Sequence, residues 1–149
     1  MRRFKVDIFT SQIEILSDNE EIIQVIDTLF EAGKTKDFSH LKDIHLDDSR
    51  FSGFSDLPPY DLKDFQTTME LEELKYVSIS DYDYEIKNPK ISIFDNTAVV
   101  AMEINQKGML VDTKAYTGEH ISIEGRATFV LIKQPTWKIV HIHLSKIHN

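Results

Sequence analysis

Two histidines and an arginine near the C-terminal end are of the types that acid–base chemistry and anion binding need. His141 and His143 stand two positions apart, so they share one face of a strand, and imidazoles exchange protons near neutral pH. Arg126 stays charged and could hold a carboxylate or carbonyl oxygen. Structural roles are the alternative: neutral buried imidazoles bonded to backbone, and an arginine paired with Glu124. Because no third ligand follows at a recognisable spacing, no metal site is predicted.

A hairpin that turns at residues 134–135 would bring these polar side chains together. It sets Arg126 opposite His143 and Thr128 opposite His141, and cross-strand partners lie on the same face. We expect helices to cover this face, so that the four residues form the wall of a ligand pocket. The other face is apolar and predicts a homodimer surface, made of Phe129, Leu131, Val140, Ile142 and Leu144. A three-residue turn would exchange the two faces.

Three further residues are candidates for the same pocket. The hydroxyl groups of Tyr60 and Tyr82 could donate hydrogen bonds to a ligand, although aromatic residues near strands often belong to the core. Glu103 shares a strand face with small apolar residues, so it needs a partner if it is buried. Arg126 is the first candidate for that partner.

The elements that must position these residues begin with helices. Ser17 and Glu20 have capping-box spacing and predict a helix that ends near Gly33. A shorter helix follows, and a third is predicted from Asp61 to about Tyr76, after a loop required by the prolines at 58–59. The side chains expected to face inward from the three are Ile22, Ile26, Leu29 and Phe30, then Phe38, Leu41 and His45, then Leu62, Phe65 and Met69.

The second half of the chain shows the alternation of strands. A strand from Tyr82 is interrupted by a bulge at Asn88-Pro89 and turns at residues 95–96. Strands are then predicted at 97–105, 121–133 and 137–146, with Trp137 buried beside the last turn. Residues 50–54 could add a short strand. Helices followed by long consecutive strands indicate an α+β fold, not a parallel α/β sheet.

Composition limits the class of protein. We expect one α+β domain over residues 18–149 and an N-terminal extension, 1–17, that forms an accessory strand or short helix. The chain has no cysteine, which excludes disulfides and thiolate chemistry and favours a cytoplasmic location. A formal net charge of −8 and scattered basic residues argue against nucleic acid as a partner. No apolar run is long enough for a membrane span, so no membrane is expected either.

The C-terminal hairpin resembles a known family. Its first strand reads R-x-T-x-V-L from Arg126, and its second reads W-x-I-V-H-x-H-x-S from Trp137. This pattern is similar to the closing hairpin of the SnoaL-like group in the nuclear transport factor two and ketosteroid isomerase-like superfamily. The resemblance covers roughly residues 18–146. It implies a cone-shaped barrel of about three helices on a strongly curved antiparallel sheet, a semi-enclosed pocket between them, and a homodimer formed through the sheet.

The resemblance does not imply one activity, because the superfamily holds isomerases, dehydratases, cyclases and assembly domains. The isomerase pattern, a pocket aspartate base with a tyrosine oxyanion donor, has no clear counterpart here. The favoured function is therefore a homodimeric small-molecule-binding domain without a cofactor. The alternatives are a cofactor-independent enzyme of proton-transfer type (isomerase, dehydratase or cyclase) and a non-catalytic assembly or adaptor domain. The expected partners are a second copy of the chain and an unknown small molecule.

Overall fold

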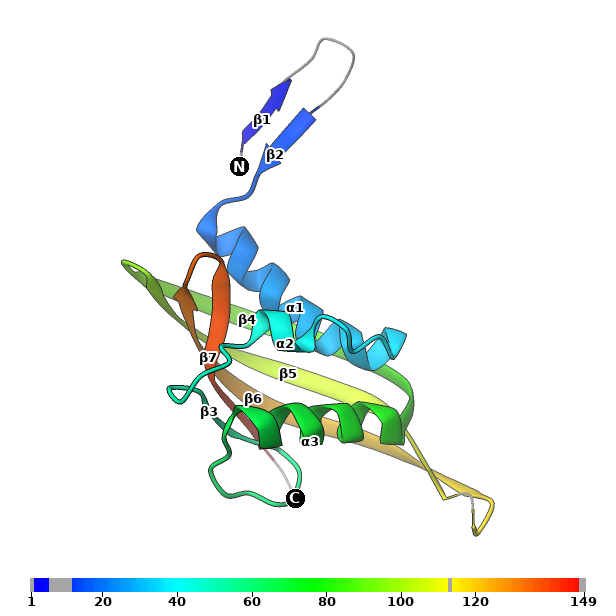
Figure 1. Ribbon diagram of the computed structural model, residues 1–149. Coiled ribbons are helices and arrows are strands. Elements are labelled where there is room, and N and C mark those ends of the chain that lie inside the picture. The colour runs from blue at the N-terminus through cyan, green and yellow to red at the C-terminus, as the bar shows by residue number, and fades with distance from the viewer. Residues whose placement is uncertain (1, 6–11, 113, 148–149) are drawn as a thin grey trace.

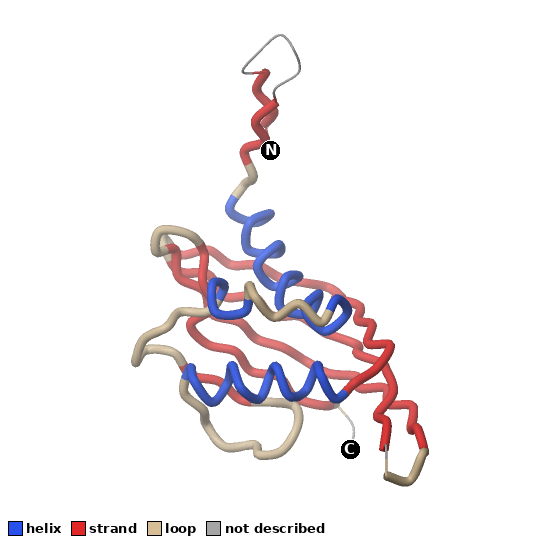
Figure 2. The backbone as a smooth tube through the Cα atoms, turned by 45° about the vertical axis from the view of Figure 1, so that its right-hand side comes forward, coloured by secondary structure: helices blue, strands red, loops and turns tan. Residues whose placement is uncertain are grey.

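Helices cover one face of a curved five-stranded sheet in the computed structural model, which describes residues 2–5, 12–112 and 114–147 (Figure 1). Figure 2 shows the same two layers turned by 45°. The predicted α+β class is confirmed, with an open, curled sheet. We call the helix-covered side of the sheet the inner face and the opposite side the outer face.

The helix α1 runs over Asp18–Thr35 and has the predicted capping box, in which Ser17 Oγ accepts from the backbone N–H of Glu20. The predicted stop at Gly33 is wrong, because the helix continues to a left-handed cap at Lys36. Gly33 serves packing instead. A Cβ atom at this position would lie 2.6 Å from the ring of Tyr82, so only glycine allows this close approach.

The other two helices differ in length. The helix α2 spans only Leu41–Ile44, and α3 spans Phe65–Ser78. Asp64, not the predicted Asp61, caps α3 by accepting from the N–H of Thr67 at 2.9 Å. The later start leaves Leu62 in the preceding loop, where it is 59% exposed, so its predicted inward position is wrong.

The main sheet has the strand order β3-β7-β6-β5-β4. Its strands are β3 (Ser52–Phe54), β4 (Ile79–Phe94), β5 (Thr97–Asp112), β6 (Thr117–Lys133) and β7 (Trp137–Lys146). The bulge predicted at Asn88-Pro89 is confirmed, since the β4–β5 register shifts between Lys87 and Lys90. The sheet is mixed, because the short β3 runs parallel to β7.

The β6–β7 pairing differs from the predicted one. Arg126 faces Ser145, Thr128 faces His143, and Val130 faces His141. Near the turn Lys133 faces Trp137, so the connection holds three residues, and a bulge at Val140 adds one more. The two irregularities move the far end by two residues, which keeps the four polar residues on one face. That face, however, is the outer one.

The core lies between the inner face and the helices. Phe129 is fully buried and meets Phe30 of α1 edge-on at 6.3 Å. Trp137 is buried beside the turn as predicted, and its indole N–H donates to Asp18 at 2.9 Å. The predicted homodimer surface is therefore wrong. Four of its five residues belong to the chain's own core, namely Phe129, Leu131, Ile142 and Leu144. The fifth, Val140, is half-buried.

The segment before α1 contains a separate antiparallel pair, β1 (Arg2–Lys5) and β2 (Gln12–Ile15). Figure 1 shows this pair beyond the N-terminal end of α1. Residues 1 and 6–11 of the predicted extension, and 148–149 of the predicted domain, lie outside the described residues. Within the described part of the chain, no helix has the length and apolar character required to cross a membrane.

Candidate functional site

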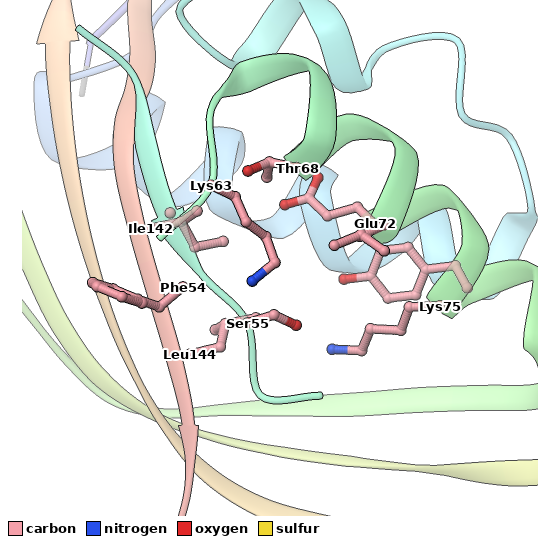
Figure 3. Close-up of a pocket in the computed structure, with 11 residues that line it drawn as sticks. Phe54, Ser55, Lys63, Thr68, Glu72, Lys75, Ile142 and Leu144 are labelled. Atoms are coloured by element: carbon pink, nitrogen blue, oxygen red, sulfur yellow. The ribbon is translucent and has the colours of Figure 1, made fainter. Parts of the chain in front are cut away.

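Two adjoining cavities lie where α3 crosses β3, the end of β7 and the inner face. The smaller cavity has a volume of about 30 Å³ and extends beneath α3 to Thr68 and Glu72 (Figure 3). The larger one has about 490 Å³ and opens between α3 and β6. They share Ser55, Leu71 and Lys75. The two cavities therefore adjoin, and we call them together the pocket, with the smaller cavity as its narrow end.

A closed loop brings polar side chains under α3. Gly53 donates its N–H to the carbonyl of Lys63 at 3.0 Å, and Lys63 returns the bond to Gly53 at 2.9 Å. These two bonds tie the ends of the segment 54–62, which carries Ser55 to both cavities and Asp56 to its buried partner Lys75. The Lys63 ammonium donates to carbonyl oxygens of Pro59 and Asp61 and to the Asp61 carboxylate. Its three N–H groups are thus all occupied.

The helix α3 presents polar residues where a core stripe would normally be apolar. Phe65 and Met69 begin the stripe, and Glu72 and Tyr76 continue it at helical spacing. Thr68 lies one turn before Glu72, and both line the small cavity. The polar side chains Thr68 and Glu72 of this helix therefore face the sheet and not the solvent.

A buried hydrogen-bond network reaches the pocket through Lys75, which lines both cavities. The Lys75 ammonium pairs with Asp56 at 3.1 Å, and both side chains are almost wholly buried. The amide of Gln106 on β5 donates to the second Asp56 oxygen at 2.9 Å, and the Tyr82 hydroxyl donates to Gln106 at 2.8 Å. Because a buried charge without a partner is strongly destabilising, this network holds Lys75 and Asp56 in place.

Tyr76 and Tyr82 remain hydrogen-bond donors. Burial raises the pKa of Tyr76 well above its usual value, and the charges of Tyr82, Glu72 and Asp56 raise it further. Burial also raises the pKa of Tyr82, against a lowering effect from Tyr76. Both phenols therefore keep their protons at any physiological pH.

Beside this satisfied network, three residues leave buried polar atoms without a hydrogen-bond partner. Among the described residues, such side-chain atoms belong to His45, Thr68 and Glu72 alone, and they include both carboxylate oxygens of Glu72. Each such group costs about 1–3 kcal/mol when no partner compensates the loss of water. Thr68 and Glu72 line the small cavity, so a group bound there would supply the partners that these two residues lack.

His45 stands directly behind Glu72. Its Nδ1 lies 2.6 Å from the Leu41 carbonyl oxygen, and its Nε2 lies 3.5 Å from Glu72 Oε1, too far for a good hydrogen bond. Burial lowers the pKa of His45, but the charge and hydrogen-bonding capacity of Glu72 and the Leu41 carbonyl outweigh it. The net effect is a raised pKa, so the imidazole binds a proton more tightly than a free imidazole does.

The residues predicted for the site are divided between the two faces. Tyr82 belongs to the core beneath the helices, where it donates to Gln106, and neither residue lines the two cavities. Arg126, Thr128 and His143 are exposed on the outer face, and the prediction that helices cover them is wrong because of the register described above. His141 lies on the same outer face, half-buried, with Nδ1 2.8 Å from the Ser52 hydroxyl.

The remaining predicted residues also lie away from the pocket. Glu103 faces Arg126 across β5 and β6, as the suggested pairing required, but on the outer face, where it accepts from Asn88 at 2.8 Å. Tyr60 is 60% exposed and shares an open depression with His143. A ligand-binding role for these outer residues stays a prediction.

Sequence reasoning missed most of the pocket. Asp56 and Gln106 carry no local signal, because a contact across 50 residues joins them. Glu72 and Tyr76 did carry one: they fall on the same helical stripe as Phe65 and Met69. A carboxylate within a core stripe marks a buried charge that needs a partner.

Helices over one face of a curled sheet, with a polar-ended pocket between the layers, define a cone-shaped α+β domain. A family model described as the SnoaL-like domain matches residues 22–148, so this chain belongs to the SnoaL-like family. The predicted resemblance is thus confirmed. None of the curated proteins matches the chain.

Solved structures agree with the family. An NTF2-like superfamily protein from Salmonella enterica serovar Typhimurium has a TM-score of 0.72 at 19% identity, covering 89% of this chain and 92% of its own. An NTF2-like family protein from Streptomyces avermitilis has a TM-score of 0.73 at 16% identity, with 89% and 97% covered. The association domain of C. elegans CaMKII has a TM-score of 0.65 at 22% identity, with 86% and 95% covered. These identities show a shared fold.

Proposed function

We propose that this domain binds a small molecule in the two adjoining cavities. The single observation that supports the proposal most is the group of buried atoms without a hydrogen-bond partner on Thr68 and Glu72, which both line the small cavity. Such atoms destabilise the fold unless a ligand supplies the missing hydrogen bonds. SnoaL-like membership is consistent with this proposal but names no ligand.

The larger cavity suits the apolar part of such a ligand. Its volume of about 490 Å³ falls within the range of small-molecule sites. Leucine and isoleucine side chains form much of its wall, including Leu74, Ile79 and Ile121, while Ser55 and Lys75 mark the passage to the smaller cavity. A bound molecule would place its apolar body near the opening and its polar head beneath α3.

A blocking substitution tests this proposal. We expect the uncharged fluorescent probe N-phenyl-1-naphthylamine to bind with increased emission, and Leu71→Trp to remove that binding by filling the junction of the cavities. Val77→Trp is the matched control, because Val77 is exposed on the same helix and lines neither cavity. Absence of binding, or equal loss in both variants, would contradict the proposal.

Self-association through the outer face is the second part of the proposal. The helices all lie on the inner face, so no described element covers the outer one (Figure 1), where Val99 and Val130 are only half-buried. Two similar structures are the association domain of C. elegans CaMKII and the S. rosetta CaMKII hub, which adds support. Sedimentation velocity should show a dimer that Val130→Glu dissociates, and a monomer at micromolar concentration would contradict this part. Ile142→Glu should instead unfold the chain, because Ile142 is in the core.

A further inference from the structure

We infer that the group entering the small cavity is an uncharged hydroxyl, of an alcohol or a phenol, which donates its proton to Glu72. This inference rests on the proposed function, because it names the chemical class of the head group that the pocket accepts. It follows from three properties of the cavity: its balance of charge, its free donors and acceptors, and the support that His45 gives to Glu72.

The charge around the small cavity is already balanced. Each cation has its own anion, in the pairs Asp56–Lys75 at 3.1 Å, Asp61–Lys63 at 3.3 Å and Glu72–His45 at 3.5 Å. A ligand carboxylate would face Glu72 without a free cation, and a ligand ammonium would meet the turned-in ammonium groups of Lys63 and Lys75 (Figure 3). In so enclosed a site either like-charge contact is unfavourable. An uncharged head group avoids both.

The free hydrogen-bonding groups call for a head group that donates and accepts. Both Glu72 carboxylate oxygens lack a hydrogen-bond partner, although Oε1 lies 3.5 Å from His45 Nε2, and the Thr68 hydroxyl nearby lacks one too (Figure 3). Lys75 uses Asp56 as its partner and keeps N–H capacity toward the cavity that it lines. A hydroxyl can donate to Glu72 while it accepts from Thr68 or Lys75. A ketone or ether lacks the donor that Glu72 needs.

His45 is the positioning residue that keeps Glu72 ready to accept. The Leu41 carbonyl accepts the proton of Nδ1, so in a neutral ring Nε2 would present a lone pair to the Glu72 carboxylate. Because the Nε2 lone pair and the Glu72 carboxylate oxygen would repel each other, a proton must lie between them. The His45–Glu72 pair therefore carries one proton in addition to the proton on Nδ1. The arrangement with an imidazolium leaves Glu72 negatively charged and able to form a strong, charge-assisted bond to a hydroxyl.

A set of matched naphthalene probes tests the head group by calorimetric titration at pH 7. We expect 2-naphthol to bind at least about tenfold more tightly than naphthalene, and more tightly than 2-naphthoate or 2-naphthylmethylammonium. Glu72→Gln should reduce the preference for 2-naphthol over naphthalene several-fold, and Glu72→Leu should abolish it. Glu73→Gln is the control, because Glu73 is the exposed neighbour on α3. In His45→Gln, the preference should become independent of pH between 5.5 and 8.

The outcomes separate the inference from the proposed function. If naphthalene binds but a charged probe binds most tightly, the inference is overturned and the proposed function stands. The same holds if Glu72→Gln, with a parental melting temperature, keeps the full preference for 2-naphthol. If none of the four probes binds, both are overturned.

Discussion

Neighbouring residues of β6 meet opposite environments. Ala127, Phe129 and Leu131 face the helices and are buried, whereas Arg126 and Thr128 alternate with them and face outward. The outer face carries the conspicuous polar pairs of the hairpin, yet solvent or a partner can satisfy them there. The inner face is mainly apolar, and its few polar contacts come from α3 and the loop before it. A polar group therefore points to a ligand site when it is buried and neither solvent nor the protein supplies its hydrogen-bond partner.

The largest difference between the faces should appear in stability. Phe129→Ala should lower the free energy of unfolding by about 3–5 kcal/mol, because it empties a site packed against Phe30. Thr128→Ala, one residue earlier on the outer face, should change it by less than about 0.5 kcal/mol. Urea unfolding monitored by circular dichroism measures both. Similar losses in the two variants would show that the assignment of faces is wrong.

Ion pairs should follow the same division. Lys75→Met leaves the buried Asp56 carboxylate without its cation, so it should cost about 3 kcal/mol or more. Lys133→Met removes an exposed pair with Asp18 and should cost less than about 1 kcal/mol. Urea denaturation of the two variants gives the comparison, and equal losses would mean that the Lys75 pair is solvated.

The histidines of the two faces should respond to pH in opposite directions. The folded-state pKa of His45 is raised, so its stabilising contribution is present below its unfolded value of 6.5 and is lost as pH rises through the folded value. Burial, followed by the charge of His143, lowers the pKa of His141. Its contribution is present above 6.5 and is lost as pH falls through the folded value.

Two variants measure this contrast over pH 5.5 to 8. The destabilisation caused by His45→Gln should be greatest at the acid end, whereas that caused by His141→Gln should be greatest at the alkaline end. Unfolding free energies that vary with pH in the same direction for both variants would remove the distinction between the buried pair and the half-exposed histidine.

The smallest effect is expected for Arg126→Ala. The side chain is exposed on the outer face, so the free energy of unfolding should change by less than about 0.5 kcal/mol. Binding of N-phenyl-1-naphthylamine should also stay unchanged in a fluorescence titration. Loss of that binding in Arg126→Ala, with Leu71→Trp still binding, would move the ligand site to the outer face, beside the polar residues of the hairpin.

The fold followed from local rules, and the site did not. Capping at Ser17 and the bulge at Asn88-Pro89 depend on a few consecutive residues, so their patterns were sufficient. Which hairpin face the helices cover depended on a three-residue turn and one extra residue, Val140, and either event changes the alternation. The contact of Asp56 with Gln106 exists only in the folded chain. Glu72 was the one pocket acid that periodicity could have singled out.

The tied loop before α3 has a consequence for how this pocket could diversify. The reciprocal bonds between Gly53 and Lys63 fix both ends of the segment 54–62, so exposed side chains at its tip, such as Pro58 and Tyr60, can change with little effect on the stability of the sheet or of α3. Asp56 and Asp61 are the fixed positions, because they pair with the buried Lys75 and Lys63, while Ser55 and Pro58 line the larger cavity. The exposed side chains of this segment can therefore be replaced while its two ends stay in place. Grafting other sequences between its fixed ends offers a route to new ligand preferences on an unchanged scaffold.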